Sequence, residues 1–254
     1  MKYLFRKILF LTLLIHIGLQ SQPNSKDYLR LAVELGTFSY SQFLYNPEKN
    51  LPNSSTINSF DSSIRNVLRW ETSSQKRANK LSDLLLYGVF VGSIPISSYW
   101  LNNFNLLLIN LEILSINGLI TNIVKYGIGR QRPYSFYQTK IDDDESFKSF
   151  FSGHTSTAFA LGTSTAKMLC NDTSFNTKAI WASTLSLATV TGYLRIAADK
   201  HYFTDVLVGA IIGSTVGHIA FEKLHRRYKK KLSNSPSLPR FSYSPFNIYL
   251  IVPL

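Results

Sequence analysis

The chain has 254 residues, which is enough for one substantial domain with a buried core and short accessory segments. Its 27 Lys and Arg residues outnumber 15 Asp and Glu residues, so the formal net charge is +12. Such an excess indicates an anionic partner (nucleic acid, an anionic membrane surface or a phosphorylated substrate), or it marks basic residues that flank membrane segments. Cys170 is the only cysteine, which excludes an intramolecular disulfide and a cysteine-based zinc site.

The N-terminus has the pattern of an export signal. Basic residues precede an apolar run over 8–19, which is short for a membrane span and typical of a signal-peptide core. Leu19 and Gln20 stand where a signal peptidase prefers small residues. Residues 1–21 are therefore expected to form a signal peptide or a signal anchor, and the pattern leaves cleavage open.

Two polar segments flank the expected core. Residues 22–82 are mixed in composition and are expected to form an extracytoplasmic N-terminal segment with short helices near 27–35 and 62–70. Residues 233–254 form a C-terminal tail, in which the partial alternation of apolar and polar residues over 241–252 is that of a strand.

The character of the sequence changes at Asp83. From Leu84 to Val124 the only charged residue is Glu112. This run is long enough for two membrane-spanning helices, with a turn expected at 100–103.

Three further helices are expected at 155–169, 179–195 and 204–224. Each has a short uncharged stretch rich in small and hydroxyl-bearing residues, so each alone could equally be a buried helix of a soluble protein. The predicted fold class is all-α: a bundle of about five to six core helices over 83–232, interpreted as membrane-embedded.

The distribution of basic residues predicts an orientation. The basic run over 223–231 follows the last apolar helix and is expected in the cytoplasm. Counting back through five spans places Lys125, the 126–153 loop, His154 and the 195–205 stretch on the outer side. The prediction is a multi-pass protein of the cell membrane with its site on the extracytoplasmic (periplasmic) face; the alternative is a soluble secreted or periplasmic protein.

Small residues recur at every fourth position in two of these helices. The rows are Ala158, Gly162 and Ala166, and Gly209, Gly213 and Gly217. Such rows let helices approach closely. His201 and Asp205 extend the second row, so the face that packs inward also carries a possible catalytic pair.

The first cluster of chemical interest runs from Lys125 to Pro133. Lys125 and Arg132 are seven residues apart, which is two turns if the segment is helical, and Pro133 is then expected to end the element. Two cations that face one point suit a phosphate group, with lysine as a point charge and arginine as a bidentate fork. The alternative is a basic cluster at a membrane edge.

The second cluster, Phe151-Ser-Gly-His-Thr155, directly precedes a predicted helix. A Ser-Gly turn that opens a helix offers backbone N–H groups and a hydroxyl to an anion. His154 could then protonate a leaving group. The alternative is helix capping by Ser152 or Thr155 beside an incidental histidine.

The third cluster runs from Arg195 to Asp205. An aspartate four residues after His201 on one helical face can hold the imidazole N–H and fix which nitrogen faces a substrate. Arg195 adds a third cation. The alternative is a surface pair of the i, i+4 type.

Together the three clusters resemble the signature of the type 2 phosphatidic acid phosphatase and vanadium haloperoxidase superfamily, which also contains bacterial acid phosphatases. That signature reads Lys-x6-Arg-Pro, then Pro-Ser-Gly-His, then Ser-Arg-x5-His-x3-Asp. The resemblance covers roughly residues 84–222. Phe151 replaces the family's proline and Leu194 replaces the serine before the arginine, which removes one hydroxyl contact to phosphate.

The resemblance implies a role for each matching position. The phosphate oxygens would be bound by Lys125, Arg132, Arg195, the Ser152 hydroxyl and the Gly153 amide. His201 would be the nucleophile, oriented by Asp205, and His154 the general acid for the leaving group. No metal, no cofactor and no nucleic acid partner is expected.

The chemistry of such a set agrees with these roles. A phosphate monoester dianion repels a nucleophile, so three cations and backbone amides must neutralise it without a metal. A neutral imidazole attacks phosphorus while a protonated one serves the departing oxygen, which predicts a bell-shaped pH profile centred at mildly acidic to neutral pH. The acidic run at 142–145 lacks ligand geometry for a metal and is expected to be a solvated loop.

The predicted function is hydrolysis of a lipid phosphate or pyrophosphate through a phosphohistidine. One alternative is a soluble secreted acid phosphatase acting on small phosphate esters with broad specificity. A vanadate-dependent haloperoxidase is a further alternative, against which the short chain and apolar helices argue. A non-catalytic lipid-phosphate binder is the non-enzymatic alternative.

Overall fold

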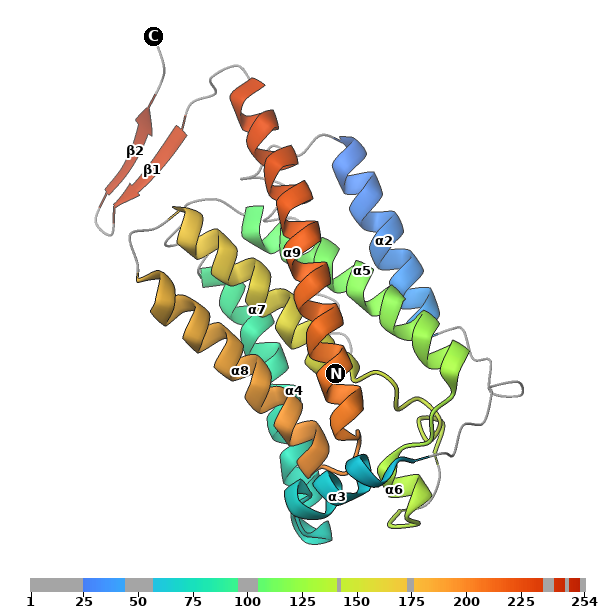
Figure 1. Cartoon of the computed structure of the whole chain (residues 1–254). Coiled ribbons are helices and arrows are strands. Elements are labelled where there is room, and N and C mark those ends of the chain that lie inside the picture. The colour runs from blue at the N-terminus through green and yellow to red at the C-terminus, as the bar shows by residue number, and fades with distance from the viewer. Residues whose placement is uncertain are drawn as a thin grey trace, which may run out of the picture.

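The structure, a computed structural model, describes residues 25–43, 57–95, 105–140, 143–172, 176–234, 240–244 and 247–251. Six long helices of this part form a bundle: α2 (Ser25–Phe43), α4 (Thr72–Pro95), α5 (Asn105–Ile128), α7 (Gly153–Asp172), α8 (Thr177–Ala197) and α9 (Phe203–Asn234). The short helices α3 (Ser59–Leu68) and α6 (Pro133–Phe136) lie together at one end of the bundle (Figure 1). The predicted all-α class is confirmed.

The C-terminal tail forms a small hairpin outside the bundle (Figure 1). Its strands β1 (Arg240–Ser244) and β2 (Asn247–Ile251) pair antiparallel, with Arg240 opposite Ile251 and Ser244 opposite Asn247. The strand expected within 241–252 is therefore two strands. The signal segment 1–21 and the turn at 100–103 lie outside the described residues.

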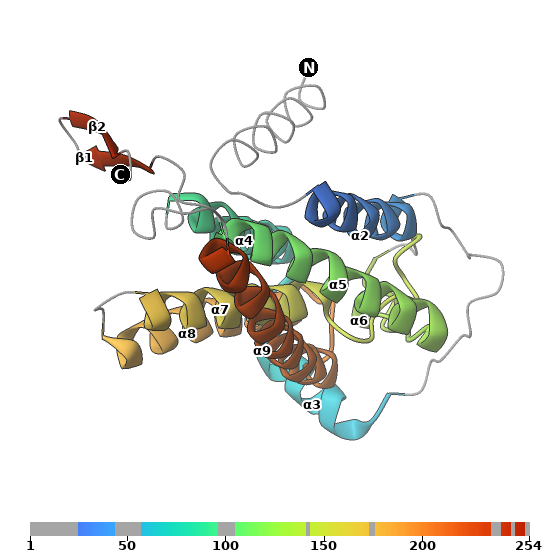
Figure 2. The same cartoon turned by 90° about the horizontal axis from the view of Figure 1, so that it is seen from above.

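Helix α7 is the centre of the bundle and contacts α4, α5, α8 and α9. Seen from above, α2 lies against α5 at one edge of the bundle (Figure 2). Two of the described helices, over Leu106–Ile128 and Phe203–Arg227, are long and apolar enough to cross a membrane.

The glycine row of α9 lets this helix lie directly on α7. A Cβ atom on Gly209 would lie 2.8 Å from the Ser152 carbonyl oxygen, and one on Gly213 would overlap the Ser156 carbonyl. The close approach predicted for this row is therefore present. In the other row, Gly162 faces α8, where a Cβ atom would lie 3.4 Å from the Thr184 carbonyl oxygen.

Polar side chains join α5 to α7 inside the core. Asn117 accepts from Ser156 Oγ at 2.6 Å and donates to Thr157 Oγ1 at 3.1 Å. Two turns away, Asn110 is bonded to the next hydroxyl pair of α7, Ser164 and Thr165. Both asparagine side chains are fully buried, and these bonds satisfy them.

The charged residue in the apolar run is buried and paired. Glu112 of α5 accepts from Arg30 of α2 at 2.6 and 3.2 Å. A carboxylate inside a helix bundle needs such a partner because desolvation of an isolated charge is costly. The pair therefore ties α2 to α5.

One local prediction about the first cluster is wrong. Helix α5 ends at Ile128 and does not continue to Pro133. Gly129 follows with φ of 58°, the left-handed conformation that favours glycine after a helix, and its N–H bonds the Lys125 carbonyl at 3.0 Å. Arg132 caps the next helix, α6, and Pro133 opens that helix instead of ending one.

The N-terminal helices are part of the same bundle. Residue 83, where the core was expected to begin, lies in the middle of α4. Helix α3 contacts α8 and α9, and α4 contacts α5, α7 and α8. Both helices therefore reach the region where the three sequence clusters meet.

Candidate active site

The three sequence clusters converge at the end of the bundle where α5 and α8 end and α7 and α9 begin. His201 lies at the centre of this convergence and is 2% exposed. The charges of Arg132, Arg195, Lys125 and His154 all act on His201. The structure thus brings together the two imidazoles and three cations that the resemblance assigns to one site.

The His201 ring is held in one orientation. Its Nδ1 lies 2.8 Å from the Ser149 carbonyl oxygen, and because a carbonyl only accepts, Nδ1 carries the proton. The lone pair then resides on Nε2. Burial and the surrounding cations lower the pKa of His201 well below its ordinary value, so the ring is neutral at neutral pH.

Asp205 acts on His201 less directly than its spacing suggests. Its Oδ2 lies 3.7 Å from His201 Nδ1, beyond hydrogen-bond distance, while the Ser149 carbonyl takes the proton. The same carboxylate accepts from Ser149 Oγ at 2.6 Å and from the Tyr202 N–H at 2.9 Å. Asp205 therefore supports His201 by charge and by holding the Ser149 segment.

Arg195 reaches the site from the last turn of α8. Its Nη1 donates to Asn79 Oδ1 at 2.8 Å and to Ser82 Oγ at 3.0 Å, both on α4. Its Nε is buried and has no hydrogen-bond partner among the described residues. A buried guanidinium donor without a partner suits an anion that arrives as a ligand.

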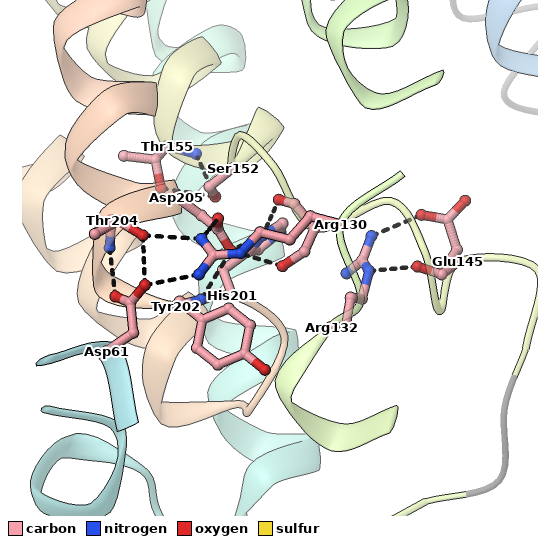
Figure 3. Close-up of polar contacts among 11 residues, drawn as sticks. Asp61, Arg130, Arg132, Glu145, Ser152, Thr155, His201, Tyr202, Thr204 and Asp205 are labelled. Carbon is pink, nitrogen blue, oxygen red and sulfur yellow. Dashed lines mark hydrogen bonds and ion pairs between the residues drawn. The ribbon is translucent and has the colours of Figure 1, made fainter. Parts of the chain in front are cut away.

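The start of α7 faces Lys125. A Cβ atom on Gly153 would lie 3.8 Å from Lys125 Nζ, so the Gly153 backbone and this ammonium border the same space. Ser152 precedes the helix and is fully buried. Its hydroxyl accepts from Thr155 Oγ1 at 2.9 Å, and its own hydrogen remains available for an anion (Figure 3). The capping role and the anion-binding role are therefore compatible.

His154 is paired with a residue that the three clusters do not contain. Its Nε2 lies 2.8 Å from Asp83 Oδ1 of α4. Asp83 also lies 3.8 Å from Arg195 Nη1. Burial, Arg195 and Lys125 lower the pKa of His154 to about 4, while Asp83 opposes the shift.

A second group of residues outside the predicted set supports Asp205 (Figure 3). Arg130 donates to Asp205 Oδ1 at 2.6 Å and to Asp61 Oδ2 of α3 at 2.7 Å. Asp61 also accepts from the Thr204 N–H at 3.0 Å and from the Thr204 hydroxyl at 2.6 Å. Arg130 was visible in sequence as one more basic residue of the first cluster, whereas Asp61 had no local signal.

Arg132 is occupied by the acidic loop. Its Nε donates to the Glu145 carbonyl at 2.7 Å, and its Nη2 lies 2.7 Å from Glu145 Oε2 (Figure 3). The loop is exposed at Asp143 and Asp144, as expected, but the half-exposed Glu145 also pairs with Arg132, which the sequence did not predict. Asp143 accepts a hydrogen bond from the Tyr134 hydroxyl, and residue 142 lies outside the described part of the chain.

Among the described residues, no cluster of three or more His, Cys, Asp or Glu side chains could hold a metal ion. The groups that converge are instead three cations, two imidazoles and the N-terminus of α7. Such a set is chemically suited to binding an oxyanion, and a neutral imidazole within it is suited to act as a nucleophile.

Known proteins resemble this chain in sequence and in fold. Over 110 residues it is 32% identical to the lipid A 1-phosphatase of Porphyromonas gingivalis, a match that covers 42% of this chain and 21% of that protein. The chain therefore spans about a fifth of the length of that relative.

Two crystal structures share the fold. LpxE of Aquifex aeolicus superposes with a TM-score of 0.50 at 21% identity, over 68% of this chain and 99% of that one. A transmembrane PAP2-type phosphatidylglycerolphosphate phosphatase of Bacillus subtilis superposes with a TM-score of 0.51 at 18% identity, over 80% and 98%.

The sequence pattern of the PAP2 superfamily matches residues 106–229, the segment that contains all three clusters. Helices α3 and α4, which supply Asp61 and Asp83, precede the matched segment. The chain is therefore similar in sequence to the PAP2 superfamily over about half of its length, and it shares the fold of two PAP2-type phosphatases.

Proposed function

We propose that the protein is a metal-independent phosphatase that removes a phosphate or pyrophosphate group from a lipid through a phosphohistidine on His201. The observation that carries the proposal is the environment of His201: a buried neutral imidazole with Nδ1–H bonded to a carbonyl, surrounded by three cations and a second imidazole.

The proposed reaction has two steps. His201 Nε2 attacks phosphorus, and the bond from phosphorus to the lipid oxygen breaks as His154 donates a proton to that oxygen. His154, now neutral, takes a proton from water, whose oxygen attacks the phosphohistidine and releases inorganic phosphate. Lys125, Arg132, Arg195, the Ser152 hydroxyl and the Gly153 amide bind the phosphate oxygens throughout.

The proposed general acid must be protonated in the complex with substrate. Burial, together with the charges of Arg195 and Lys125, lowers the pKa of His154 to about 4. A bound phosphate dianion opposes both cations and raises that pKa, so substrate binding itself favours the protonated acid. Asp83 adds a permanent negative charge at 2.8 Å on the other side of the ring.

A lipid substrate is supported by the surface around the site. Exposed apolar side chains cover the faces of α4, α8 and α9 from the level of the site along the bundle: Leu81, Leu84, Tyr87 and Val91, Leu187, Val190 and Tyr193, and Leu207 and Ile211. On α4, the exposed basic residues Lys76, Arg77 and Lys80 directly precede this apolar face. A border between basic and apolar surface is typical of a membrane interface.

The names of the relatives agree with a membrane lipid as substrate, since one acts on lipid A and another on phosphatidylglycerolphosphate. We therefore propose a multi-pass membrane protein in which the site lies at headgroup depth. Because the last helix ends in the basic run 223–231, the site end is assigned to the extracytoplasmic face.

The proposal is tested by phosphate release from a panel of lipid phosphates and one aryl phosphate, in the presence of a chelator. His201→Ala should reduce kcat at least about a thousandfold because it removes the nucleophile. Activity that disappears in the chelator would contradict the metal-free mechanism. Absence of turnover on every substrate by the folded wild-type protein would favour a non-catalytic lipid-phosphate binder.

A further inference from the structure

Glu145 occupies the Arg132 guanidinium that the proposed function assigns to the substrate phosphate. Its carboxylate Oε2 lies 2.7 Å from Arg132 Nη2, and its Oε1 lies 3.4 Å from Lys148 Nζ. The Arg132 side chain is 4% exposed, whereas that of Glu145 is 46% exposed. The arginine is thus buried, and the more exposed Glu145 contacts its guanidinium (Figure 3).

Two separate contacts join these residues, and only one involves the carboxylate. Arg132 Nε donates to the Glu145 backbone carbonyl at 2.7 Å, a bond that any side chain at this position would leave intact. Loss of the carboxylate would therefore free Nη2 while the backbone contact continues to orient the guanidinium.

The charge of Glu145 reaches the whole phosphate-binding set. Arg132, Lys125 and Lys148 lower the pKa of Glu145, so its side chain is anionic at neutral pH. The same carboxylate acts electrostatically on Arg195. The Glu145 carboxylate therefore neutralises part of the positive charge of Lys125, Arg132 and Arg195. It also repels an anion that binds between them.

We infer that Glu145 is a specificity-determining residue that competes with phosphate for Arg132 and thereby weakens binding of the inorganic phosphate product. This inference rests on the proposed function. A lipid substrate gains additional binding from its apolar part, whereas free phosphate depends on the phosphate-binding residues alone. Competition by Glu145 therefore lowers the affinity for product more than the affinity for substrate.

The test measures equilibrium binding of inorganic phosphate by calorimetry, in full-length protein that carries His201→Ala and so does not turn over. Glu145→Gln in this background should tighten the phosphate Kd about tenfold, since one negative charge close to a bound dianion is removed. Asp144→Asn is the matched control: it removes the same charge from an exposed neighbour on the same loop and should change Kd less than about twofold.

The direction in which the phosphate Kd changes shows whether Glu145 competes with phosphate for Arg132 or holds Arg132 in place for phosphate. If Glu145 merely holds Arg132 in place, its removal loosens the guanidinium and weakens phosphate binding, and that result would overturn the inference. An unchanged Kd would also overturn it. If neither protein binds phosphate or lipid phosphate, the proposed function itself fails, and the inference fails with it.

A second readout uses the active protein. With His201 intact, Glu145→Gln should lower the inhibition constant of inorganic phosphate about tenfold while KM for the lipid substrate falls by a smaller factor. Equal changes in both constants would show that Glu145 does not discriminate product from substrate. A melting temperature equal to that of the wild type would confirm that the variant is folded.

Discussion

Asp83 reaches His154 from α4, a helix that carries none of the three sequence clusters. The 2.8 Å contact to Nε2 fixes which ring nitrogen remains for the substrate, because a carboxylate accepts the proton of Nε2 and leaves Nδ1 for the site. Asn79 donates to Asp83 Oδ2 at 3.2 Å and accepts from Arg195. One turn of α4 therefore positions both His154 and Arg195.

Asp83→Asn should slow the reaction without abolishing substrate binding. The carboxylate opposes the downward shift that places the pKa of His154 at about 4, so its removal lowers this pKa further. A smaller fraction of His154 is then protonated at a given pH, and the basic limb of the kcat profile should move to lower pH. At pH 7 we expect kcat to fall about tenfold to a hundredfold.

The measurement is a pH series of kcat and KM for Asp83→Asn with two aryl phosphates whose leaving groups differ in pKa. The loss should be smaller for the better leaving group, which needs less protonation. Equal losses for both substrates, or an unmoved basic limb, would mean that Asp83 has a structural role only.

The predicted and the missed residues of the site differ in a physical way. Lys125, His154 and His201 were identifiable because each stands in a short segment whose spacing already implies a chemical role. Asp61 and Asp83 were not, since each acts through a partner 69 or more residues away, and a single acidic residue on a polar helix has no local signature.

Among the elements, α3 shows an unusual distribution of polarity. Its charged residues Asp61 and Arg65 are buried, whereas Phe60 and Val67 are 55% and 80% exposed. Arg65 makes a two-pronged ion pair with Asp199 at 2.6 and 2.7 Å. The charged side of α3 thus packs against the bundle. Through Asp199 and Thr204, it holds the segment of chain that leads into α9.

The contact between α7 and α9 determines the separation of the two histidines, because His154 opens one helix and His201 precedes the other. Gly213→Ala should destabilise the protein by about 1–3 kcal/mol, since the new methyl group would overlap the Ser156 carbonyl and push the helices apart. Activity should fall more than stability alone explains, because the two imidazoles lose their spacing.

Stability is measured by thermal or denaturant unfolding in detergent, and activity at a temperature where the variant is folded. Gly88→Ala on α4 is the control, because no atom lies within 4 Å of a Cβ placed there. Its stability should be unchanged or slightly higher. A Gly213→Ala variant that matches this control would show that the glycine row is not needed for close packing.

Sequence periodicity predicted the helices well and their ends less well. The helix expected at 155–169 spans Gly153–Asp172, and the one expected at 179–195 spans Thr177–Ala197. The last helix extends well beyond its apolar part to Asn234, because basic residues of high helix propensity continue it. The break after Ile128 was missed, although Gly129 is the residue that permits it.

At the scale of the whole molecule, the exposed apolar faces of α4, α8 and α9 separate the site end of the bundle from its other end. If these faces lie in a membrane, a reagent confined to one side of the membrane should reach only one of the two ends. In a Cys170→Ala background, a membrane-impermeant maleimide applied to intact cells should label Asp144→Cys, an exposed position at the site end. Arg226→Cys, exposed near the opposite end of α9, should react only after lysis, in keeping with the basic run beside it.

Labelling of Arg226→Cys in intact cells, with Asp144→Cys reacting only after lysis, would place the site in the cytoplasm. Labelling of both positions, together with release of the protein by osmotic shock without detergent, would instead favour the soluble acid phosphatase. Phosphatase activity of each cysteine variant confirms that it is folded.

The longest-range contacts of the site join Asp61 to Thr204 and Arg65 to Asp199, across 143 and 134 residues. A ribosome therefore delivers α3 and α4 long before the partners that they hold, and closing so large a loop comes late in folding. A nascent chain has no assembled reaction centre until its final long helix is in place. If the proposed function holds, we therefore expect no phosphatase activity from a chain whose synthesis has not reached α9.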